Sequence, residues 1–104
     1  MNAYDLIPEA EADLRSILRY TIEQWGVEQA QRYADLLEAG FHKIATKKAA
    51  SRTFSEVYPQ IRVTKCEHHY IFYLPQQPTF SRPLILAVLH ERMDLVSRLK
   101  SRLE

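Results

Sequence analysis

The feature that most constrains the fold of this 104-residue chain is a change in the spacing of its apolar residues. In the first half they recur every three or four positions, which is typical of an α-helix with one buried side. One such stripe lies before Gly26 and a second lies after it: Ala10, Leu14, Ile17, Leu18, Ile22, Trp25, then Val27, Ala30, Tyr33, Ala34, Leu37, Phe41, Ile44. Because a single glycine separates the stripes, the pattern predicts an antiparallel helix hairpin, with Pro8 in the first turn.

After residue 55 the apolar spacing becomes that of β-strands. Three strands are predicted, at residues 61–66, 70–74 and 84–89, and residues 3–6 alternate as a short fourth strand would. Residues 47–55 show no pattern, and Pro75 to Pro83 is predicted as a loop. The short links between the predicted strands favour an antiparallel sheet. An amphipathic basic helix is predicted after the last strand, with an apolar edge formed by Leu95, Val96, Leu99 and Leu103. The predicted order is β-α-α-β-β-β-α, an α+β fold in a single domain over residues 1–104.

Composition removes several classes of function. Two glycines leave almost nothing from which to build a glycine-rich phosphate or dinucleotide loop, so no cofactor is expected. One cysteine rules out an internal disulfide framework and favours a reducing compartment. The longest apolar run, residues 84–89, is too short to span a bilayer, and residues 1–5 do not resemble a signal peptide. We therefore expect a cytoplasmic protein with no membrane contact.

Charge is unevenly distributed along the chain. Residues 1–41 hold eight acidic and three basic side chains, a net charge of −5, whereas residues 42–104 hold eleven basic and five acidic ones, a net charge of +6. This asymmetry indicates either a surface for an anionic partner or two halves that neutralise each other in the folded protein.

Candidate chemistry centres on the histidines. The segment His90 to Asp94 begins like a zinc-protease helix but lacks the second histidine, and Cys66 with His68 is an incomplete ligand set, so no metal site is predicted. A Cys66–His68 nucleophilic pair lacks a group to orient the base. Metal-independent RNA cleavage is the stronger enzymatic hypothesis, because it needs a base, an acid and cations for phosphate. Residues of those types lie on or beside the predicted sheet: His68, His69, His90, Tyr70, Tyr73, Arg62, Lys65 and Arg92. The aromatic residues among them could equally be core.

Four segments resemble the RelE/ParE toxin superfamily in their order and spacing. They are residues 8–20, a first-helix signature, residues 24–26 before the second helix, residues 66–73 and residues 88–94. The similarity covers residues 3–103, and the last segment is most similar to the ParE branch. One departure is Ile7, which stands where many family members have a Ser or Thr helix cap.

The resemblance implies the toxin of a type II toxin–antitoxin pair, which inhibits DNA gyrase, blocks replication and is neutralised by a ParD-like antitoxin. Contact with DNA would be indirect, through the antitoxin or gyrase. The alternative is a ribosome-dependent mRNA endonuclease of the RelE type, in which Arg62 and Tyr73 could correspond to part of the nuclease site. A gyrase inhibitor needs a complementary surface and no catalytic group.

Two sets of surface candidates follow. For gyrase they lie at the end of the last strand and on the basic sheet: His90, Arg92, Met93, Asp94, Arg62 and Lys65. Asp94 and Arg92 could instead form a helix cap and an ion pair. For the antitoxin they lie on the helix stripes, as walls of an apolar groove: Leu14, Ile17, Leu18, Trp25, Tyr33 and Leu37. The edge formed by Leu95, Leu99 and Leu103 is a candidate to cover part of that groove when the antitoxin is absent.

Overall fold

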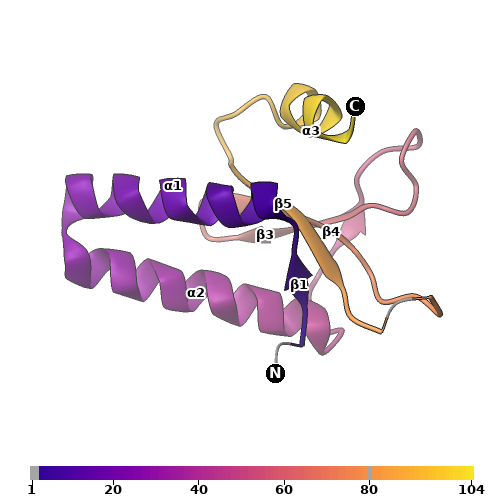
Figure 1. Cartoon of the computed structure of the whole chain (residues 1–104), viewed down its shortest axis with the longest axis horizontal. Helices are drawn as coiled ribbons and strands as arrows, with labels where there is room; N and C mark the ends of the chain where they lie inside the picture. The colour runs from indigo at the N-terminus through magenta and orange to yellow at the C-terminus, as the bar shows by residue number, and fades with distance from the viewer. Residues whose placement is uncertain (1–2, 80) are drawn as a thin grey trace.

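The computed structural model describes residues 3–79 and 81–104 and has three layers. A helix hairpin covers one face of a five-stranded sheet, and a C-terminal helix packs on the other face (Figure 1). In chain order the elements are β1 (Asp5–Leu6), α1 (Pro8–Trp25), α2 (Val27–Ala45), β2 (Arg52–Thr53), β3 (Arg62–Cys66), β4 (His69–Leu74), β5 (Leu84–His90) and α3 (Leu95–Leu103). Met1 and Asn2, part of the segment compared with a signal peptide, and Phe80, in the predicted loop, lie outside the described residues.

The predicted helix hairpin is confirmed. Pro8 occupies the first turn of α1, where its missing N–H removes no helical hydrogen bond, and Ile7 at the N-cap provides no side-chain bond. Gly26 has φ 92° and ψ 169°, a backbone conformation that only glycine adopts readily. Its N–H donates to Ile22 O, and its carbonyl accepts the N–H of Ala30, so one residue ends α1 and begins α2. Within the described residues, no helix has the length and apolar character needed to cross a membrane.

The sheet has the order β1-β5-β4-β3-β2, and its β3-β4-β5 part is antiparallel as predicted. Two features differ from the prediction. β1 pairs with β5 in parallel, since the hairpin carries the chain across the sheet between them, so the sheet is mixed. β2 pairs with β3 inside the segment that showed no pattern, because both of its residues are exposed and leave no apolar alternation to detect.

Residues 84–89 form a continuous apolar run because the two faces of β5 pack against different cores, and a β-bulge interrupts their alternation. Tyr73 pairs with Ile85 and Phe72 pairs with Ala87, so Leu86 is the extra residue. The bulge places Ile85 and Val88 together in the core beneath the hairpin. The intervening Leu86 and Ala87 belong to the second core, beneath α3. Both faces of β5 are therefore covered, and neither is polar.

The helix α3 lies on the face opposite the hairpin, where Leu99 is fully buried in the second core. The prediction that its apolar edge covers a groove beside the hairpin is therefore wrong. Arg102 reaches Asp13 of α1 through two hydrogen bonds of 2.6 and 2.9 Å. The same pair provides hydrogen-bond partners for backbone groups of β5 that the short β1 does not reach. Arg102 donates to Leu86 O, and Asp13 accepts from the N–H of Val88.

Candidate functional site: a groove between the hairpin and the sheet

A groove of about 990 Å³ lies where the outer part of the hairpin meets the start of β4 and the end of β5. We call it the hairpin–sheet groove. Its lining comes from α1, α2, the β3–β4 turn and the segment after β5: Ser16, Ile17, Tyr20, Thr21, Trp25, Glu28, Gln29, Arg32, Tyr33, His68, His69, His90, Arg92 and Met93. In Figure 1 the turn end of the hairpin projects to the left beyond the sheet, so the outer part of both helices has no strand beneath it.

The groove brings together residues that the sequence analysis assigned to two different surfaces. His90, Arg92 and Met93 were candidates for gyrase, and Ile17, Trp25 and Tyr33 were candidates for the antitoxin. The end of β5 faces the helix stripes because β5 lies beneath α1, which the chain order alone does not reveal. Three members of each candidate set therefore line one depression, whereas Arg62, Lys65 and Asp94 of the gyrase set do not line it.

The remaining antitoxin candidates lie nearer the core. Leu37 is 1% exposed and belongs to the core beneath the hairpin, and Leu14 packs against that core. Leu18 is half-buried. None of the three lines the hairpin–sheet groove in the described part of the chain.

Asp94 is the N-cap of α3. One carboxylate oxygen accepts the N–H of Ser97 at 3.2 Å, and the other accepts the Ser97 hydroxyl at 2.9 Å. These bonds hold the pKa of Asp94 below its ordinary value. Of the two roles considered for this residue, the structure shows the cap. Arg92 lines the groove, is exposed and forms no ion pair with any of residues 3–79 and 81–104.

The buried His69 and the half-buried Tyr33 form a hydrogen-bonded floor in the groove. The backbone N–H of His68 donates to the Tyr33 hydroxyl oxygen at 3.2 Å, and that hydroxyl lies 2.5 Å from His69 Nδ1. Burial, followed by the neighbouring His90 and His68, lowers the pKa of His69 to about 4. His69 is therefore neutral at pH 7, so its Nδ1 can accept a hydrogen bond from the Tyr33 hydroxyl. Burial also raises the pKa of Tyr33.

The rim beside this floor carries a charge cluster that the sequence analysis missed. Glu91 accepts from His68 Nδ1 at 2.9 Å and from Lys65 Nζ at 3.0 Å. Hydrogen bonds from His68 and then Lys65 lower the pKa of Glu91 to about 2, and Glu91 in turn raises the pKa of Lys65. Lys65, a gyrase candidate, thus forms an ion pair with Glu91, in the turn that follows β5. The contact pairs β3 with the end of β5 across β4, so sequence spacing gave no signal for it.

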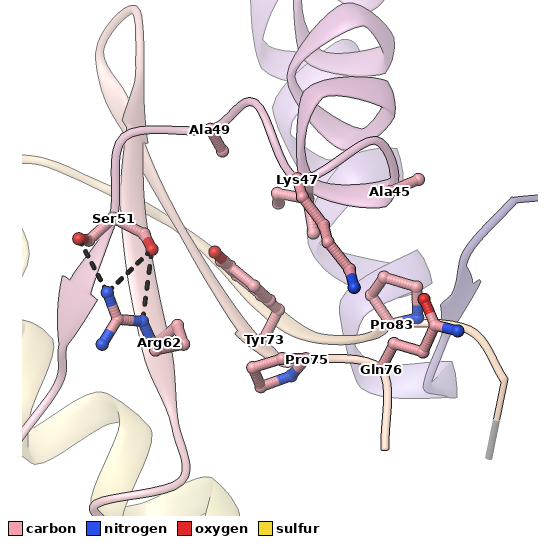
Figure 2. A pocket seen from close by; sticks show the side chains of 10 residues that line it. Ala45, Lys47, Ala49, Ser51, Arg62, Tyr73, Pro75, Gln76 and Pro83 are labelled. Atoms are coloured by element: carbon pink, nitrogen blue, oxygen red, sulfur yellow. Dashed lines mark hydrogen bonds between the residues drawn. The ribbon is translucent and has the colours of Figure 1, made fainter. Parts of the chain in front are cut away.

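Six of the eight residues of the nuclease hypothesis fall into two groups, whereas Tyr70 packs against the core beneath α3 and Lys65 belongs to the charge cluster on the rim. His68, His69, His90 and Arg92 lie at the groove. Arg62 and Tyr73 face each other across β3 and β4 and line a separate pocket of about 310 Å³ (Figure 2). Tyr73 is four residues along β4 from His69, about 13 Å at the rise of an extended strand. In the described part of the chain, no three side chains of the metal-ligating types are grouped closely enough to hold an ion.

Comparison with known proteins gives a consistent result. Residues 4–95 match the family described as ParE toxin of type II toxin-antitoxin system, parDE. The chain is 47% identical to Toxin ParE of Escherichia coli over 106 residues, covering 100% of this chain and 99% of that protein. It is 33% identical to Toxin ParE1 of Caulobacter vibrioides, covering 90% and 94% of the two chains. A structure titled chromosomal ParDE TA system from P. aeruginosa has the same fold, with a TM-score of 0.67, 20% identity, and coverage of 85% of this chain and 96% of that one.

Proposed function

The chain belongs to the ParE toxin family of type II toxin–antitoxin systems, and from this premise we propose that it inhibits DNA gyrase by binding through the hairpin–sheet groove. We further propose that a ParD-like antitoxin neutralises it by occupying the same groove, in the cytoplasm. The observation that carries the proposal is that three of the six gyrase candidates and three of the six antitoxin candidates line one depression. A partner seated there would cover the other partner's contacts.

The groove has the properties of a protein-binding surface. Trp25 is 73% exposed and Tyr20 is 62% exposed, although large aromatic side chains are usually buried unless a partner covers them. Tryptophan, tyrosine and arginine are also the residues that most often dominate binding energy at interfaces. The apolar wall beside a neutral, hydrogen-bonded floor gives such a partner a dry surface on which to pack.

The charges of the lining favour an acidic partner segment. Arg32 and Arg92 stand against one carboxylate, Glu28, so the lining has a net positive charge. An acidic segment with apolar anchors could pack on Trp25 and pair with the two arginines. The disordered acidic tail expected of a ParD-like antitoxin has this chemistry. Inhibition of gyrase by the same surface requires binding only and no catalytic group.

The test compares Trp25→Ala with Val27→Ala. Val27 is 69% exposed at the same end of the hairpin but does not line the groove. We expect wild type and Val27→Ala to inhibit supercoiling and accumulate cleaved DNA with purified gyrase. Trp25→Ala should lose at least about tenfold in potency and in antitoxin affinity, because an interface tryptophan typically contributes about 2 kcal/mol or more.

A parallel assay distinguishes the nuclease alternative. Messenger RNA cut in translating ribosomes, with supercoiling unaffected, would replace gyrase inhibition by the RelE-type activity. Supercoiling inhibition that is relieved by antitoxin, but is equally strong in Trp25→Ala and wild type, would place the gyrase contact outside the groove.

A further inference from the structure

We propose that the pocket around Lys47, Arg62 and Tyr73 binds the phosphate group of a small molecule. This pocket is about 310 Å³ in volume and is separate from the hairpin–sheet groove. The inference does not depend on the proposed toxin function. It rests on the number of hydrogen-bond donors in the pocket, on the backbone that holds Lys47, and on the absence of a carboxylate among the described residues that line the pocket.

Figure 2 shows the donors on different sides of the pocket, with the Arg62 guanidinium on the Ser51 side. Lys47, just beyond α2, extends its ammonium toward the end formed by Pro83 and Gln76, and Tyr73 directs its hydroxyl toward the side formed by Ser51 and Ala49. No hydrogen bond or ion pair joins the Lys47 ammonium, the Tyr73 hydroxyl or the Gln76 amide to another of the described residues. These three groups can therefore donate to a ligand.

Arg62 adds a fixed positive charge. Its guanidinium donates to the Ser51 hydroxyl and carbonyl and to the Thr53 hydroxyl, at distances of 2.8–3.2 Å. All of these acceptors are neutral oxygens, so they hold the side chain in place without cancelling its charge. One N–H of Nη1 remains beyond those bonds, because a guanidinium carries five.

The lining contains two cations and, among the residues that the structure describes, no acidic side chain. A concave site with two uncompensated positive charges and several donors is suited to a small oxyanion. The negative end of the α2 helix is covered, because its last carbonyls accept N–H groups: Lys43 O from Lys48 and Ala49, and Ile44 O from Lys47. This arrangement reduces the repulsion that an anion would otherwise meet at a helix C-terminus.

The backbone of Lys47 supports a role for its side chain. Lys47 has φ 62° and occupies the left-handed position that follows the helix, with the paired hydrogen bonds of a Schellman motif. Glycine is the residue that best fits this position, since a side chain there is strained. A lysine at this site gives up some stability, and the side chain that it places in the pocket offers a reason.

The strain permits a test that separates binding from folding. Replacing Lys47 by glycine removes the ammonium and also relieves the backbone, so Lys47→Gly should melt at the same temperature as wild type or higher. The same variant should bind phosphate at least about tenfold more weakly, because a hydrogen bond to a charged group is typically worth that much. Tyr73→Phe should weaken binding by about fivefold while keeping the ring in the core.

The measurement is a titration of the full chain, followed by amide chemical shifts of residues 44–51 and 73–76 at constant chloride. The probes are inorganic phosphate, a nucleoside 5′-monophosphate and a short single-stranded oligonucleotide. Lys48→Gln is the matched control, because Lys48 is exposed beside Lys47 and does not line the pocket. It should leave the dissociation constant within about twofold of wild type.

Saturable binding of inorganic phosphate or of the nucleotide that is lost in Lys47→Gly and retained in Lys48→Gln supports the proposal. The relative affinity of these two probes then shows whether free phosphate or a phosphate monoester is the better ligand. The proposal is overturned by binding of the oligonucleotide alone, by equal losses in the two lysine variants, or by no saturable change in shifts with any probe.

Discussion

The two halves of the helix hairpin have the same apolar spacing but differ in burial. In the half that lies on the sheet, Ala10, Leu37, Phe41 and Ile44 are at most 4% exposed. In the outer half, Tyr20, Trp25 and Val27 are between 62% and 73% exposed. The 18 residues of α1 extend about 27 Å, whereas the six residues of β4 extend about 20 Å, so the helices project beyond the sheet. The outer half is thus a candidate docking surface built from the same pattern as the core.

The largest expected effect separates the two halves by stability. Phe41→Ala should lower the free energy of unfolding by about 4 kcal/mol, because it leaves a cavity in the core beneath the hairpin. Trp25→Ala should change it by about 0.5 kcal/mol or less, since its ring is already exposed. Urea denaturation of both variants measures the difference. A comparable loss in Trp25→Ala would mean that the outer half is part of the folded core.

The second effect concerns how the inner half is held to the rest of the fold. Asp13→Ala should cost about 3 kcal/mol, because it removes the partner of Arg102 and leaves the N–H of Val88 without an acceptor. The matched control is Asp5→Ala, which breaks an exposed Asp–Arg pair with Arg82 and should cost about 1 kcal/mol at most. Thermal unfolding of the two variants checks this. Equal losses would contradict the assigned role of Asp13.

The third effect lies at the boundary between the halves, where His69 contacts Tyr33. The folded-state pKa of His69 is about 4 and its ordinary value is 6.5, so the unfolded chain binds a proton that the folded protein does not between those pH values. Stability should therefore fall as the pH decreases, by about 2 kcal/mol between pH 7 and pH 4.5.

His69→Phe provides the control, because it removes this titration. Unfolding measured at half-unit intervals of pH should show a shallower decline in the variant than in wild type across that range. Parallel curves would assign the acid sensitivity to other groups.

The smallest effect tests how closely the inner half approaches the sheet. A Cβ at Gly40 would lie 3.0 Å from Cys66 Sγ and 3.3 Å from Ile71 Cδ1. Gly40→Ala should therefore be destabilising by about 1 kcal/mol, even though alanine favours helices. Adding Cys66→Ala should recover most of that loss if the sulfur is the obstacle. At the exposed outer position Gln24→Ala should change stability by a few tenths of a kcal/mol.

Local patterns predicted the elements that depend on local chemistry. Pro8, Gly26 and the two stripes defined the hairpin, alternation defined β3, aromatic and β-branched residues defined β4, and a continuous apolar run defined β5. The two-residue strand β2 and the parallel pairing of β1 depend on neighbours distant in the chain, so no local pattern marks them. The same limit applied to α3, whose apolar edge was correctly predicted but was assigned to the wrong face.

The sequence predicted the gyrase candidates and the antitoxin candidates as two separate sets of residues and did not predict that members of both would line one groove. The individual residues His90, Arg92, Ile17 and Trp25 were selected by type and spacing, but their meeting in one groove depends on the order of strands in the sheet. The Tyr33–His69 hydrogen bond joins residues 36 positions apart, and the Glu91 cluster bridges two strands that are not neighbours. Both are consequences of tertiary structure.

The parallel pairing of β1 with β5 has a consequence for the order of events during synthesis. Asp5 is paired with Leu84, so the sheet can close only when most of the chain has left the ribosome. At roughly 5–20 residues per second, the hairpin emerges several seconds before that partner strand. The hairpin–sheet groove also needs His90, Arg92 and Met93, and it therefore forms only after these residues have left the ribosome. A binding partner already present in the cell can meet this surface as it forms.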